Sequence, residues 1–134
     1  MTNVIDYITI ASVGNAADFG DLTVARYGLA ACSNGTTGRG VFGGGFITST
    51  STNVIDYITI ASAGNATDFG DLTVTRHALA ACSNGIDGRG VFGGGIMGSA
   101  VNNIEYVMIA TLGNATDFGD LTVARESLAA CADA

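Results

Sequence analysis

The stretch NATDFGDLT at residues 65–73 recurs unchanged at 114–122 and, with one substitution, as NAADFGDLT at 15–23. It contains Asp-Phe-Gly, the triplet that binds magnesium in protein kinases. A catalytic triplet has no reason to occur three times in 134 residues, whereas a corner of a repeated structural unit does. The chain also has no Lys to hold a phosphate and no His-Arg-Asp sequence. We therefore interpret the Phe as a buried strand residue flanked by turn-forming Asp and Gly.

The repetition extends outward from this stretch over the whole chain. NVIDYITIAS at 3–12 returns at 53–62, and a diverged copy, NNIEYVMIAT, begins at residue 102. Internal periods of about 50 residues are typical of solenoids, propellers and arrays. We predict a single repeat domain over residues 1–134, with repeats at 3–52, 53–101 and 102–134, the last of them incomplete.

Each repeat is expected to contain four short strands. The alternating, β-branched sequence VIDYITIA suits one strand, and DFGDLTV suits a second that follows the turn-forming GNAT. GLAACSNG is apolar and ends in the hairpin signal Asn-Gly, and GRGVFGGG ends in glycines, which permit positive φ. Four strands joined by turns in about 50 residues are typical of a propeller blade.

VFGGG, at 41–45 and 91–95, resembles the hydrophobic run and double glycine of a kelch repeat. The aromatic residue of kelch strand c, the kelch Trp and the Arg before the inner strand then correspond to Tyr57 and Tyr106, Phe69 and Phe118, and Arg76 and Arg125. The resemblance covers essentially the whole chain, which departs from the kelch pattern in having no Trp. The repeats are also similar to kelch-like arrays in predicted virion proteins of marine phages.

The resemblance implies an all-β, kelch-like β-propeller segment of about 2.75 four-stranded blades, which starts and stops within a blade. Phe19, Phe69 and Phe118 are expected to fill the outer space between blades. The implied strands are a at 28–33, 78–83 and 127–132; b at 39–43 and 89–93; c at 4–10, 54–60 and 103–109; and d at 19–24, 69–74 and 118–123.

The segment DLTVTRHALAAC at 71–82 leaves an alternative fold open. It could form a helix with Asp71 as N-cap and Asn84-Gly85 as the C-terminal stop. The chain would then be an α/β repeat solenoid.

Composition argues against several classes of function. A net charge of −7 disfavours nucleic acid, because phosphates require a basic face, and it disfavours an anionic membrane surface. No apolar run reaches the roughly 18 residues of a membrane-spanning helix, and the N-terminus shows no basic, cleavable signal. The compartment stays open, since a virion and the cytoplasm are both compatible with such a chain.

The motifs that could carry chemistry favour structural roles. GRGVFG at 38–43 and 88–93 matches GxGxxG, but a dinucleotide site needs a following helix, and here more glycine follows. The acidic pairs of the DFGD stretches lack the spacing of known calcium loops. Cys32, Cys82 and Cys131 share one repeat position without the close pairs of a metal site, so we expect them to be small buried residues. No catalytic residue, cofactor or metal is predicted.

A ligand, if one is bound, is expected on the face that carries residues 27, 46–52, 77, 96–102 and 126. Between residues 3–45 and 53–95 the repeats differ only in or beside proposed turns, which are free to vary, at the pairs 13/63, 17/67, 25/75, 27/77, 28/78, 36/86 and 37/87. The linkers FITSTSTN at 46–53 and IMGSAVNN at 96–103 also differ. The candidate residues are Arg26, Tyr27, Arg76, His77, Arg125 and Glu126. The arginines could hydrogen-bond a neighbouring blade or act as forks for an anion.

We expect a non-enzymatic module for recognition or scaffolding, of the kind found in a phage structural or tail-associated protein, with a protein or glycan ligand. The alternative is a fragment of a propeller-type glycan-active enzyme, for which only His77 and Glu126 stand out. Closed propellers need about four to eight blades, so self-association or further blades in flanking sequence are expected.

Overall fold

The computed structural model describes residues 1–35, 38–85 and 88–133. All the secondary-structure elements in these ranges are β-strands. The protein is therefore all-β. The helix considered for 71–82 is wrong, because these residues end one strand, turn, and begin another. The differing pairs 36/86 and 37/87 lie outside the described residues. In the part of the chain that is described, no helix is long and apolar enough to cross a membrane.

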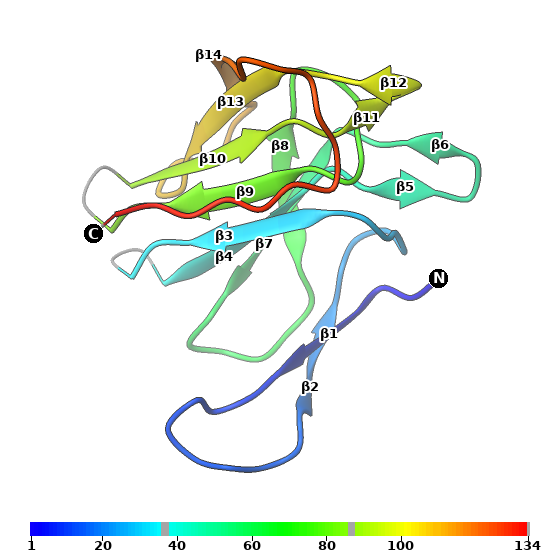
Figure 1. Cartoon of the computed structure of the whole chain (residues 1–134). Helices are drawn as coiled ribbons and strands as arrows, with labels where there is room; N and C mark the ends of the chain where they lie inside the picture. Colours follow the sequence, from blue (N-terminus) through cyan, green and yellow to red (C-terminus); the bar gives the residue numbers. More distant parts are fainter. Residues whose placement is uncertain (36–37, 86–87, 134) are drawn as a thin grey trace.

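Two four-stranded antiparallel sheets form the body of the molecule (Figure 1). The first has the order β3 (Ala30–Ser33), β4 (Arg39–Gly43), β7 (Val54–Thr59) and β8 (Thr67–Asp71). The second has the equivalent order β9 (Ala80–Ser83), β10 (Arg89–Gly93), β13 (Asn103–Met108) and β14 (Thr116–Asp120). The two sheets meet where β3 lies against β9.

An N-terminal hairpin repeats the outer half of these sheets. β1 (Val4–Tyr7) pairs with β2 (Ala17–Asp21) in the register of β7 with β8, including a bulge at the same position. It forms a separate two-stranded sheet, which lies below the first sheet in Figure 1. Two short hairpins project together from one end of the sheets, β5 (Phe46–Ile47) with β6 (Thr50–Ser51) and β11 (Ile96–Met97) with β12 (Ser99–Ala100).

The predicted strands agree with this arrangement in part. Strands b at 39–43 and 89–93 coincide with β4 and β10. Strands d begin two residues earlier than predicted, because Ala17 and Thr67 already pair with tyrosines of the neighbouring strand. The strand predicted at 127–132 is wrong: this segment runs beside β9 in Figure 1 but is irregular, since no described strand pairs with it.

One apolar cluster joins the two sheets and includes Val41, Ile55, Phe69, Leu72, Leu79, Phe92, Val107 and Ile109. Gly43 admits the ring of Phe92, since a Cβ there would lie 2.7 Å from it. Phe19 and Phe69 are buried as predicted, but Phe118 is 53% exposed. The prediction for Phe118 is wrong because no described segment packs against it in the way that the following repeat packs against the other two.

Candidate functional site

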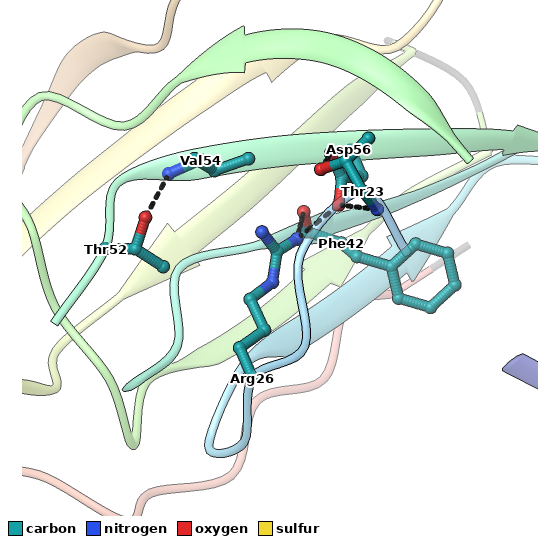
Figure 2. Close-up of polar contacts among 6 residues, drawn as sticks. All are labelled: Thr23, Arg26, Phe42, Thr52, Val54 and Asp56. Atoms are coloured by element: carbon teal, nitrogen blue, oxygen red, sulfur yellow. Dashed lines mark hydrogen bonds and ion pairs between the residues drawn. The ribbon is translucent and has the colours of Figure 1, made fainter. Parts of the chain in front are cut away.

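Arg26 lies in the turn that leads from β2 into the first sheet, and its side chain is buried. Its Nη2 donates to Oδ2 of Asp56 at 2.9 Å and to the carbonyl of Phe42 at 3.3 Å (Figure 2). Thr23 completes the cluster, because its hydroxyl donates to Oδ1 of Asp56 at 2.7 Å and its backbone N–H to Oδ2 at 3.3 Å. The turn is thereby fastened to the middle of the sheet that it enters.

Arg76 repeats this arrangement in the second sheet. Its Nη2 is paired with Oε1 of Glu105, and its Nη1 donates to the carbonyls of Gly94 at 3.0 Å and Asn103 at 2.9 Å. The backbone N–H of Thr73 donates to Oε2 of the same carboxylate at 2.6 Å. Burial lowers the pKa of Arg76 from its usual range, and the neighbouring Glu105 carboxylate opposes that shift. With no exposed side-chain surface, this guanidinium acts as an internal cross-link and cannot contact an external anion.

The carboxylate partners of the two arginines, Asp56 and Glu105, were not predicted from the sequence. A signal was present: all three copies of the strand, VIDY, VIDY and NIEY, hold an acidic residue between an Ile and a Tyr. An acid retained there, together with a repeated Arg, is compatible with a buried ion pair. The two residues are about 30 positions apart in the chain, so only the fold shows that they meet.

Arg125 and Glu126 are exposed, in contrast to Arg26 and Arg76. Nε of Arg125 donates to the carbonyl of Val123 at 3.2 Å, and among the described residues no carboxylate pairs with it. Its backbone is nevertheless held like that of Arg76, since Gly95 donates to the Arg125 carbonyl at 2.9 Å. The six candidates are therefore not one site: two are internal and four face solvent at least in part.

Tyr27 and His77 belong to a row of rings at the base of the short hairpins. Tyr27 and Phe46 exchange backbone hydrogen bonds of 3.2 and 2.8 Å, as do His77 and Ile96. The centroid of the Phe46 ring lies 5.5 Å from that of Tyr27 and 4.8 Å from that of His77. The Ser51 hydroxyl lies 2.9 Å from Nδ1 of His77. Residues 27 and 46–52 thus lie on the same side, as predicted.

These residues form a surface that we call the aromatic strip, defined by Tyr27, Phe46, His77, Ile96 and Met97. Tyr27 is 56% exposed, and Phe46 and His77 are half-buried. The strip offers apolar ring faces beside a phenolic hydroxyl and an imidazole, a combination that can stack on an apolar surface and hydrogen-bond at its edge.

The three cysteines are free thiols at equivalent positions of successive repeats. Cys32 and Cys82 are half-buried and Cys131 is exposed, so the expected burial is wrong for Cys131. Burial raises the pKa of Cys32 to about 12, and the nearby Cys82 adds to the shift. Over the described ranges, no three His, Cys, Asp or Glu side chains are grouped so as to hold a metal ion.

A scan against models of protein families finds no matching family, and a search of curated proteins finds no significant match. The resemblance to kelch repeats therefore rests on the residues of the chain itself.

Proposed function

We propose that the protein is a non-enzymatic recognition module built of kelch-like repeats, in which the two four-stranded sheets are consecutive blades of a propeller segment. Three features support this reading. Both sheets have the same meander order, the innermost strands β3 and β9 are neighbours, and the N-terminal hairpin has the form of the outer half of a preceding blade. A virion structural or tail-associated protein is the setting we propose for such a module.

The observation that carries the recognition role is the aromatic strip. Its members differ between repeats: His77 takes the position of Tyr27, and Ile96 takes that of Phe46. The buried arginine and carboxylate recur in both repeats. Variable side chains on an unchanging frame are typical of binding surfaces on repeat proteins. Rings also supply a large contact area with few rotatable bonds to immobilise, which favours binding.

The ligand class we propose is a glycan. The apolar C–H face of a sugar ring can lie on the rings of Tyr27 and Phe46, while its hydroxyl groups meet the phenol and the imidazole of His77. The aromatic strip supplies both the apolar ring faces and the polar groups within one short row of residues.

A glycan array probed with the labelled chain tests this function. Tyr27→Ala is expected to weaken binding of any glycan recognised by about tenfold or more, as truncation of a ring at a binding hot spot does. Ile10→Ala is the matched control, since Ile10 is 94% exposed in the loop between β1 and β2. The bound glycan should be recovered unchanged by mass spectrometry. Glycan cleavage or oxidation would favour the enzymatic alternative, and binding indifferent to Tyr27→Ala would contradict the proposed site.

A further inference from the structure

Consecutive repeats interlock through the Gly-Asn-Ala loop of one repeat and the outer strand of the repeat before it. Gly64 donates its N–H to the carbonyl of Phe19 at 2.7 Å, and Ala66 donates to that of Asp21 at 2.8 Å. The N–H of Asp21 in turn donates to Oδ1 of Asn65 at 3.1 Å. The loop thereby occupies the outer edge of β2.

The same contacts recur one repeat later, between residues 113–115 and β8. Gly113 donates to the carbonyl of Phe69 at 2.9 Å, Ala115 donates to that of Asp71 at 2.8 Å, and Asp71 donates to the Asn114 side chain at 3.0 Å. The phenylalanine is buried in both interlocked strands, at 7% exposure for Phe19 and 2% for Phe69. The chain thus makes one kind of interface twice.

Both halves of a third such interface are present but do not meet within the chain. β14 is the edge strand of the second sheet, and its Phe118 is 53% exposed. At the other end of the molecule, Gly14, Asn15 and Ala16 repeat the loop sequence and are exposed. The surface that each half would cover is therefore accessible to another molecule.

A charge pair is divided between the two ends in the same way. Asp6 takes in β1 the place that Asp56 takes in β7, and Arg125 takes the place of Arg76, yet Asp6 and Arg125 are both exposed. The backbone of each residue is already positioned without the partner. Asp6 lies in β1, which has the register of β7, and the Arg125 carbonyl accepts a hydrogen bond from the Gly95 N–H. Within the described residues, Asp6 and Arg125 form no ion pair, and each is held in position at an opposite end of the molecule.

We propose that a second copy of this chain docks head to tail, with residues 14–16 of one copy on β14 of the other and Asp6 of the first paired with Arg125 of the second. Hydrogen-bonding groups, apolar surface and charge are complementary, since each contact reproduces one that the chain makes internally. The two surfaces that meet are different, so the association is heterologous and continues into a ring or a filament. It does not depend on the proposed ligand.

The groove beside β1 gives this joint room for the final residues of the other copy. It has a volume of 540 Å³ and is bounded by Ile5 and Asp6 of β1, by Ala31 and Phe42 of the first sheet, and by Leu29, which precedes β3. The apolar segment 127–132 of the docked copy enters the groove as an innermost strand. One strand is missing between it and β1, so the joint is weaker than the two internal ones.

A single fluorophore tests the docking. The chain has no Trp, so Phe118→Trp reports on the β14 surface alone. Light scattering over micromolar to millimolar concentrations should show the molar mass rising above the 13.4 kDa of one chain. The Trp emission should shift to shorter wavelength over the same range, as the ring leaves water. A mass that stays at 13.4 kDa with unchanged emission overturns the proposal.

Charge reversal identifies the contact. Asp6→Arg and Arg125→Asp each bring like charges together and should weaken association by about tenfold or more, whereas the double variant exchanges the signs and should restore it. Asp68→Arg makes the same change of net charge as Asp6→Arg at an exposed position away from both ends and should leave association unchanged. Single variants without effect, or a double variant that fails to recover, contradict the proposed pairing.

Discussion

Glu105→Ala is expected to destabilise the fold by about 3–5 kcal/mol, as the removal of one partner from a buried ion pair does. Glu105 is 1% exposed and Arg76 is fully buried. Among the residues that the structure describes, the truncation leaves the guanidinium with only backbone carbonyls as acceptors and with no compensating charge. The backbone N–H of Thr73 also loses its acceptor, but Thr73 is exposed, so water can replace the carboxylate oxygen and this loss adds little to the total.

Two further variants separate charge burial from simple loss of contact. Arg76→Met combined with Glu105→Leu should recover most of the lost stability, because apolar side chains that replace a whole buried pair are often neutral or stabilising. Arg125→Met is the matched control, since Arg125 has the same repeat position but no carboxylate partner in the described part of the chain, and it should change stability by no more than about 0.5 kcal/mol.

Urea denaturation followed by circular dichroism gives the free energies of unfolding. It should be run at a protein concentration where light scattering shows single chains, because association adds to apparent stability. A loss below about 1 kcal/mol for Glu105→Ala, the range of exposed pairs, would show that water reaches the Arg76 pair and would refute this reasoning.

The remaining predictions concern the core, the thiols and a glycine corner. Phe69→Ala should cost about 3–5 kcal/mol as a buried aromatic truncation, and the half-exposed Phe118 much less in the single chain; equal losses in urea melts would contradict this. Alkylation at mildly alkaline pH, followed by mass spectrometry, should modify the exposed Cys131 well before Cys32. Faster modification of Cys32 would be inconsistent with its burial. Because burial raises the pKa of the Cys32 thiol from 9.0 to about 12, the neutral thiol's contribution to stability is complete below pH 9.0 and is lost as the pH rises toward 12. Gly70→Ala should destabilise by at least about 1 kcal/mol, because φ is +146° and a Cβ would lie 2.5 Å from a backbone carbonyl of the next loop, and an unchanged midpoint would show that the loop can withdraw.

The strands of the repeat were predictable from local sequence, and their ends less so. The expectation of strands rested on the alternating residues of VIDYITIA and on short apolar runs that stop at glycines, and the bounds of β4 and β10 followed from the resemblance to kelch repeats. The start of β2 was missed, because its first residues lie in what reads as a turn until Tyr7 pairs with Ala17. Pairing across a hairpin is a contact between segments, and turn composition alone does not reveal it.

The site was predictable only on its exposed side. Position 27 differs between repeats and was placed correctly beside residues 46–52, since turn order along a meander fixes which loops share a face. The carboxylate partner of each arginine was not predicted. Asp56 and Glu105 lie about 30 residues after Arg26 and Arg76 in the chain, and only the pairing of the strands between them brings each pair together.

The sequence by itself determined the repeat, the strand pattern and the glycine corners, all of which depend on residues close together in the chain. Only the tertiary structure decided which copy of each repeated residue is buried. The segments 65–73 and 114–122 have identical sequences, yet Phe69 is 2% exposed and Phe118 is 53% exposed. Arg76 and Arg125 differ in the same way, one enclosed with a carboxylate and the other in solvent. Burial and ion pairing depend on what packs against a residue, so identical local sequences have different environments wherever their neighbours differ.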